Sequence, residues 1–220
     1  MSRLFTFLCL SLLFNLAQAQ LPTPEYKKGQ AILSGTIANY NPDDNLIFKI
    51  GAPNIVMGTA ETLYPTVESD GSFTINIPLY HHTQVRMMIG NADLVILLSP
   101  EKETNVAINL SNPPGKQFVF SGQYATINNE WCQPELITKI PPVYSDGDLL
   151  DSIVGISANE FKKRCINQYK RYVTHNSAQL QFSEDTRTLA NLSCAFDCLE
   201  NLQATHYCLQ TACQKKADPF

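Results

Sequence analysis

Cysteine is the residue type in this sequence most able to do chemistry, and its distribution is uneven. The chain has seven cysteines. Those that follow residue 130 are Cys132, Cys165, Cys194, Cys198, Cys208 and Cys213. No two of them have the Cys-x-x-Cys spacing, which lowers the pKa of one thiol and holds a second, resolving thiol nearby. The spacing therefore does not favour redox catalysis by these thiols.

Several of these cysteines fall at helical spacing near the end of the chain. In an unbroken helix, six small residues would form one narrow seam, because they follow each other at steps of three and four. They are Cys194, Cys198, Asn201, Thr205, Cys208 and Ala212. Leu189, Leu192, Phe196 and Leu199 lie on a different side. A helix that is apolar on two sides is expected to pack between two partners.

Two interpretations of the cysteine seam stay open. Free cysteine often acts as a small core residue, and that role needs no chemistry. If the helix breaks near residues 201–205 and turns back as a hairpin, disulfides become feasible, with Cys194–Cys213 and Cys198–Cys208 as the expected pairs. Zinc binding by Cys194, Cys198, His206 and Cys208 is not predicted, because ligands along one helix seam cannot surround a metal tetrahedrally.

Other candidate chemistry is sparse. The sequence contains no Gly-x-Ser-x-Gly, no His-Glu-x-x-His and no phosphate-binding glycine-rich loop. His81-His82 follow the end of an expected strand and are interpreted as an exposed turn. We therefore predict no catalytic residue, no metal ligand and no cofactor. Trp131 and Tyr124 are the candidates for an aromatic patch that would bind a glycan or a peptide.

The elements that must position these residues begin with a strand over 72–79, in which apolar and polar residues alternate. Asp70-Gly71 before it is a strong turn signal. It predicts a hairpin with an arm over 59–68. Leu94–Leu98 is continuously apolar, which predicts a central strand buried on both faces. With the short segments around them, these give seven or eight strands and predict an antiparallel β-sandwich over residues 20–130, or alternatively an open barrel.

The composition changes after residue 130, and residues 131–220 are expected to form a connector and a helical region. Ser157 with Glu160 forms a capping box, and Ser183 is placed as the N-cap of a second helix. The predicted fold class is therefore α+β, with the β-domain first and the helical segment after it.

The first 19 residues read as a cleavable signal peptide. Arg3 precedes an apolar run over 4–16, and Ala17-Gln18-Ala19 gives a small-residue cleavage site. The mature protein is therefore expected in the periplasm or cell envelope, associated with a membrane only through that location. The net charge of −4 and the pI near 5.5 do not favour nucleic acid as a partner.

Four motifs, in this order, resemble the N-terminal region of exported bacterial thiol-disulfide oxidoreductases of the TlpA type. They are Ile32-x-Ser34-Gly35-x-Ile37, Asp70-Gly71-Ser72-Phe73, Leu97-Leu98-Ser99-Pro100-Glu101 before Val106-x-Ile108-Asn109-Leu110, and Phe120-Ser121-Gly122-x-Tyr124-Ala125-x-Ile127-Asn128-Asn129-Glu130. In that family, a small β-domain and a helical stretch precede a thioredoxin-like domain. The resemblance covers roughly residues 30–215 and brings no catalytic residue with it, since the expected thioredoxin-like domain would begin beyond Phe220.

Three functional hypotheses follow. The resemblance implies a non-catalytic exported accessory module, whose sheet edges and helices contact a protein partner or a thioredoxin-like domain. The second hypothesis is a thiol-disulfide active protein that uses its late cysteines. The third is a β-sandwich that binds glycans or peptides.

Overall fold

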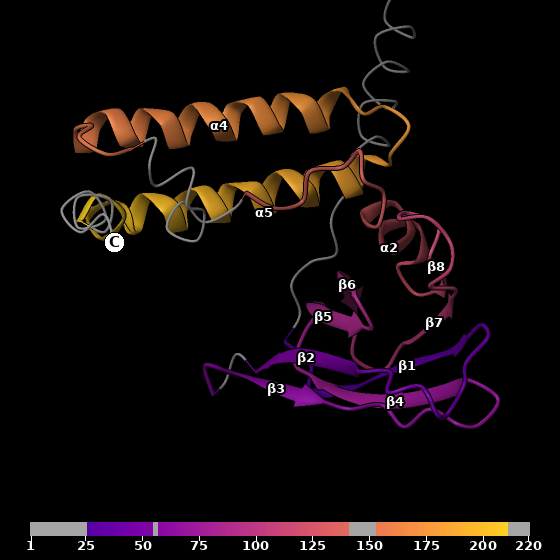
Figure 1. Cartoon of the computed structure of the whole chain (residues 1–220). Helices are drawn as coiled ribbons and strands as arrows, with labels where there is room; N and C mark the ends of the chain where they lie inside the picture. Colours follow the sequence, from indigo (N-terminus) through magenta and orange to yellow (C-terminus); the bar gives the residue numbers. More distant parts are fainter. Residues whose placement is uncertain (1–25, 55–56, 141–152, 211–220) are drawn as a thin grey trace, which may run out of the picture.

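The computed structural model describes residues 26–54, 57–140 and 153–210, and shows a β-domain with a helical layer beside it (Figure 1). The predicted α+β fold, with strands first and helices after them, is confirmed. The expected signal peptide and Cys213 lie outside the described residues.

Eight strands form two four-stranded sheets. One sheet has the order β4-β1-β7-β8, and the other has the order β3-β2-β5-β6. The strands are β1 (Gly29–Ile37), β2 (Phe48–Asn54), β3 (Thr59–Leu63), β4 (Ser72–Leu79), β5 (Thr83–Ile89), β6 (Ala92–Leu98), β7 (Glu103–Ile108) and β8 (Phe118–Gly122). All neighbouring strands pair antiparallel except β1 and β7, which are parallel.

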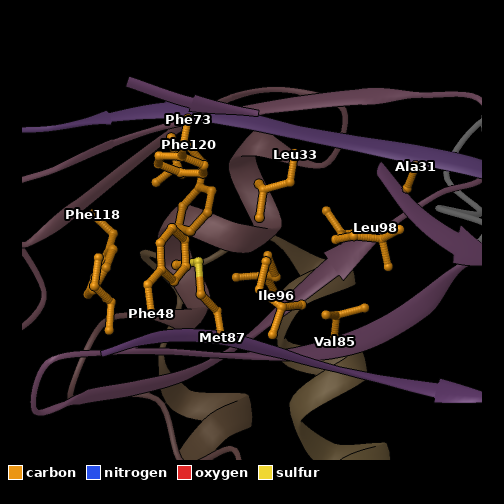
Figure 2. Packing of buried hydrophobic residues seen from close by; sticks show 14 of the residues in the cluster. Ala31, Leu33, Phe48, Phe73, Val85, Met87, Ile96, Leu98, Phe118 and Phe120 are labelled. Carbon is orange, nitrogen blue, oxygen red and sulfur yellow. The ribbon is translucent and has the colours of Figure 1, made fainter. Parts of the chain in front are cut away.

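The core between the sheets is built by alternation, since every second residue of each strand points inward. Figure 2 shows Leu33 and Phe73 from one sheet facing Met87 and Val85 from the other. The rings of Phe48 and Phe73 meet edge to face across the core, with their centroids 4.9 Å apart. Apolar burial on both inner faces therefore holds the sandwich together.

The turn predicted at Asp70 is present, but the predicted pairing of the strands on its two sides is wrong. Gly71 adopts φ 82°, and Asp70 Oδ1 accepts from the Ser72 N–H at 2.9 Å. The strand that leaves this turn, β4, pairs with β1, while β3 pairs with β2. A single bridge, Val67 to Phe73, is what remains of the expected pairing. Turn chemistry is local, whereas β4 pairs along its edge with a strand far away in the sequence, in a register that puts the apolar residues of both strands on the inner face of the sheet.

The apolar run over 94–98 is also placed differently from the prediction. It forms β6, which is the edge strand of its sheet. Ile96 and Leu98 are buried in the core, while Val95 and Leu97 lie on the outer face and contact a groove that Trp131 and Leu189 also line. Helical residues cover this outer face, which explains an apolar sequence on both sides of an edge strand.

After the strands, the described residues include the helices α2 (Ala125–Trp131), α4 (Ala158–Ala178) and α5 (Glu184–Gln203). Both predicted N-caps are confirmed, because Ser157 Oγ accepts from the Glu160 N–H and Ser183 Oγ accepts from the Thr186 N–H. The helices α4 and α5 lie side by side (Figure 1). The break considered for residues 201–205 amounts to one turn residue, Ala204, after which residues 205–210 are helical again.

The predicted seam on α5 is buried as expected. Cys194 is 0% exposed, Cys198 5% and Asn201 2%. The second apolar side is not sandwiched, because Leu192, Phe196 and Leu199 are 45%, 70% and 52% exposed in the part of the chain that the structure describes.

Candidate binding cleft

The candidate site lies where the two sheet edges β6 and β8 meet the helices, and α2 organises it. Asn128 on α2 is 1% exposed and makes two hydrogen bonds to the backbone of one residue of β6. Its Oδ1 accepts from the Leu97 N–H at 2.7 Å, and its Nδ2 donates to the Leu97 carbonyl at 3.1 Å. A side-chain amide thus occupies the place of a neighbouring strand for one residue.

Asn129, the next residue on α2, makes the same pair of backbone hydrogen bonds to a strand of the other sheet. Its Oδ1 accepts from the Phe120 N–H at 2.7 Å and its Nδ2 donates to the Phe120 carbonyl at 2.9 Å, so β8 is clamped as well. The Glu130 carboxylate then accepts from the N–H and the hydroxyl of Ser183, at the start of α5. The Asn128-Asn129-Glu130 part of the family-like motif is therefore structural: it fixes α2 to both sheets and to α5.

The two hydrogen bonds between Asn128 and Leu97, named the Asn128 clamp below, show which backbone groups of β6 point away from its sheet. In an antiparallel strand, the N–H and the carbonyl of one residue point to the same side, and successive residues alternate between the paired side and the free side. Because the N–H and carbonyl of Leu97 point outward to Asn128, those of Val95 and Asp93 also point outward. No residue in the described part of the chain is recorded as a partner for the outward groups of Val95, so β6 keeps a short free edge there.

This free edge opens into a cleft of about 490 Å³ between the sandwich and the helical region. Its lining comes from β5 and β6, the β7–β8 turn, the end of α2, the connector and α5. The residues used below are Arg86, Asp93, Val95, Phe118, Trp131 and Asp197. Sequence reasoning singled out Trp131 alone among these, because a site gathered from segments far apart in the chain has no local spacing signal.

The cleft carries charges of both signs. The Arg86 guanidinium binds both carboxylate oxygens of Asp93, with Nε 2.8 Å from Oδ1, and this bond lowers the pKa of Asp93. On the opposite wall, burial raises the pKa of Asp197, although its carboxylate accepts from the Ile140 N–H at 2.6 Å. A ligand with polar groups of both kinds would therefore find partners here.

The two aromatic candidates are not brought together. Trp131 lines the cleft, whereas Tyr124 lies at the start of α2, where its ring meets His82 edge to face and its hydroxyl is hydrogen-bonded to His82 Nδ1. His81 Nδ1 is 2.6 Å from the Thr83 hydroxyl. These histidines thus hold side chains in place around the β4–β5 turn.

Two of the cysteine thiols that the structure describes are hydrogen-bonded to backbone carbonyls. Cys194 donates to the Ile137 carbonyl at 3.4 Å, and Cys198 donates to the Cys165 carbonyl at 3.7 Å rather than bonding to Cys208. Burial raises the pKa of Cys132 to about 12 and that of Cys194 to about 11. The expected Cys198–Cys208 disulfide is not formed in this structure. The expected Cys194–Cys213 pair stays a prediction, because Cys213 lies outside the described residues.

Across residues 26–54, 57–140 and 153–210, no cluster of three or more His, Cys, Asp or Glu side chains has the arrangement of a metal site. Within the same ranges, no helix combines the length and apolar character that crossing a membrane requires.

Comparison with known proteins gives little further guidance. No family model and no curated protein matches the chain. One solved structure, described as a "putative cell adhesion protein" from Bacteroides ovatus, is similar over 44% of this chain and 43% of its own, with 12% identity and a TM-score of 0.25. At that TM-score the likeness carries no argument about fold or function.

Proposed function

We propose that this protein is a non-catalytic interaction module that binds an extended peptide segment of a partner protein along β6. The observation that carries the proposal is the free edge of β6 at Asp93 and Val95, which opens into the cleft. Adding a strand to an exposed sheet edge is a general mode of peptide recognition, in which backbone hydrogen bonds give affinity and side-chain pockets give specificity.

The walls of the cleft suit a peptide strand. Its backbone would lie beside Val95, and alternate side chains would contact Trp131 and Phe118 on the apolar side. The Arg86–Asp93 pair and Asp197 would meet polar or charged side chains. The partner we propose is therefore an extended segment that alternates apolar and polar residues.

The module works outside the cytoplasm in this proposal, because residues 1–19 have the pattern of a signal peptide. The resemblance to the N-terminal region of TlpA-type oxidoreductases supports an accessory role beside thiol-disulfide chemistry. The raised thiol pKa values at Cys132, Cys165 and Cys194 argue against the chain carrying out that chemistry itself.

Trp131 allows a direct test, since it is the single tryptophan of the chain and it lines the cleft. Peptides are selected from a displayed library of random 12-residue sequences, and their binding is followed by Trp131 fluorescence. The variant Val95→Pro removes the outward N–H without removing a hydrogen bond to β5. We expect Val95→Pro to weaken the binding of the selected peptides about tenfold or more, because one backbone hydrogen bond is lost and the proline ring clashes with the peptide.

Val95→Ala is the matched control, because it shortens the same side chain and keeps the N–H. It should bind within about threefold of the unmodified chain, as a peripheral apolar contact implies. Equal binding by Val95→Pro and the unmodified chain would exclude pairing at β6. Fluorescence changes with a panel of oligosaccharides but with no selected peptide would instead support the glycan hypothesis.

A further inference from the structure

Three cysteines from three segments share one buried apolar cluster between the helices. Cys165 comes from α4, Cys198 from α5 and Cys208 from the helical stretch over 205–210. Their exposed fractions are 5%, 5% and 0%. The cluster lies in the helical layer, apart from the β6 cleft, and the proposed function makes no use of it.

Cys165 and Cys198 are in contact. The Cys198 sulfur lies 3.7 Å from the carbonyl oxygen of Cys165, and the two residues are 33 positions apart in the sequence. The carbonyl and the side chain of Cys165 are both attached to its Cα. The Cys198 sulfur, which contacts this carbonyl, therefore lies near the Cys165 side chain, and rotation about χ1 of Cys165 can move its sulfur toward that of Cys198. Cys194, one turn earlier on α5, is directed to Ile137 in the connector instead.

We infer that Cys165 and Cys198 form an oxidation site, at which a disulfide links α4 covalently to α5. This pairing differs from both pairs expected from the sequence. It is more direct because it joins two helices that already pack side by side, rather than two positions along one seam. Both cysteines are free thiols here, on helices that already pack against each other.

The reaction is a thiol-disulfide exchange with a small disulfide, such as oxidised glutathione. One thiol loses its proton, and its thiolate attacks a sulfur of glutathione disulfide, releasing one glutathione thiolate. The second protein thiolate then attacks the mixed disulfide and releases the other glutathione. The two protein thiols give up two electrons and two protons in total, and glutathione disulfide is reduced to two glutathione thiols.

The packed helices make this reaction slow. Burial raises the pKa of Cys165 to about 11, with a smaller contribution from the neighbouring thiols, and burial also raises that of Cys198. The thiolate fraction at neutral pH is therefore very small while α4 and α5 stay packed. Exchange is expected to proceed through an opened state, or during folding, before the sulfurs are buried.

The test uses the full chain, refolded in a glutathione redox buffer, alkylated and mapped by mass spectrometry without reduction. Trypsin releases Cys165 in the peptide 165–170, and further cleavage before Asp197 and after Glu200 separates Cys198 from Cys194 and Cys208. The expected result is a cross-linked peptide that joins Cys165 to Cys198. Oxidation should also raise the Tm by about 8 °C, because the bond closes a loop of about 34 residues.

Cys198→Ser should abolish the cross-link and the Tm difference between oxidised and reduced protein, and Cys194→Ser on the same helix should leave both unchanged. A cross-link from Cys165 or Cys198 to Cys208, or two alkylated thiols at Cys165 and Cys198 after oxidation, would overturn the assignment. The mapping of the unmodified chain decides the question even where a variant fails to fold.

Discussion

The two hydrophobic cores of this molecule differ in their side-chain composition. The sandwich core is made of aliphatic and aromatic side chains from eight strands, with Leu33, Ile50 and Ile77 at 0% exposure. The helical core contains Phe161 as its largest fully buried side chain, together with thiols and buried polar residues such as Asn176 and Asn201. Large apolar groups contribute the most free energy on burial. We therefore expect apolar burial to contribute more to the stability of the sandwich, and buried polar contacts to contribute more to the position of the helical layer.

Asn176 is the clearest example of a buried polar contact in the helical layer. It is 0% exposed on α4, and its side-chain amide accepts from the Ile137 N–H at 3.0 Å and donates to the Ile137 carbonyl at 2.8 Å, in the connector. The same paired geometry recurs at Asn128 and Asn129. Polar pairs of this kind specify one arrangement, because an imperfect fit leaves buried amide groups unsatisfied.

The largest expected effect tests the sandwich side of the comparison. Leu33→Ala removes a fully buried side chain between the sheets and should lower the free energy of unfolding by about 3 kcal/mol. Cys194→Ala is the counterpart in the helical core, and it should cost about 1 kcal/mol because only one sulfur and one weak hydrogen bond are lost. Urea titrations followed by circular dichroism measure both. Equal losses would contradict the proposed difference between the cores.

The next effect tests the polar contacts that join the layers. Asn128→Ala leaves the outward peptide groups of Leu97 without their partner at a buried site, and should cost about 2 kcal/mol. Asn129→Ala removes the same pair of bonds from Phe120 at a less buried position, and about 1 kcal/mol is expected. Hydrogen exchange at the Leu97 amide should rise in the first variant and stay slow in the second. Unchanged protection at Leu97 would mean that Asn128 does not hold β6.

The smallest effect concerns two carboxylates on opposite walls of the cleft. The folded pKa of Asp93 lies below 3.8, so its contribution to stability is present above pH 3.8 and is lost as the pH falls through the folded value. The folded pKa of Asp197 lies above 3.8, so its ionisation opposes folding at neutral pH and this cost is relieved as the pH falls toward 3.8. Both are partly exposed, and each effect should stay below about 1 kcal/mol.

Thermal unfolding between pH 3 and 7 checks this pair. Relative to the unmodified chain, Asp93→Asn should be less stable at pH 7 and should lose that difference at the acidic end. Asp197→Asn should show the opposite trend, with its deficit smallest at pH 7. If the stability of both variants, relative to the unmodified chain, changed with pH in the same direction, the opposite pKa shifts assigned to Asp93 and Asp197 would be wrong.

The sequence predicted the local features of the fold well. Alternation located the strands, Ser157 and Ser183 marked the helix starts, and the cysteine seam of α5 is buried as its spacing indicated. Each of these signals lies within a few residues. The partner of β4 and the edge position of β6 were not predictable in this way, because strand order depends on contacts between segments far apart in the chain.

The candidate site was mostly invisible in the sequence for the same reason. Trp131 was named for its aromatic ring, but the hydrogen bonds of Asn128 span 31 positions and leave no periodic pattern. The outer side of α5 was misjudged because Leu192, Phe196 and Leu199 have the residue types of a core face. Hydrophobic type alone does not reveal whether a partner element is present to cover a face.

The Asn128 clamp has a consequence for solubility. A bare edge strand is a template on which identical chains can stack, and its risk of aggregation grows with the length of unpaired backbone. By occupying the peptide groups of Leu97, Asn128 shortens the open run of β6, and the charge of Asp93 lies beside the rest. The open backbone that remains on β6 is therefore only long enough to pair with one short segment, which lowers the risk of edge-to-edge stacking at this strand.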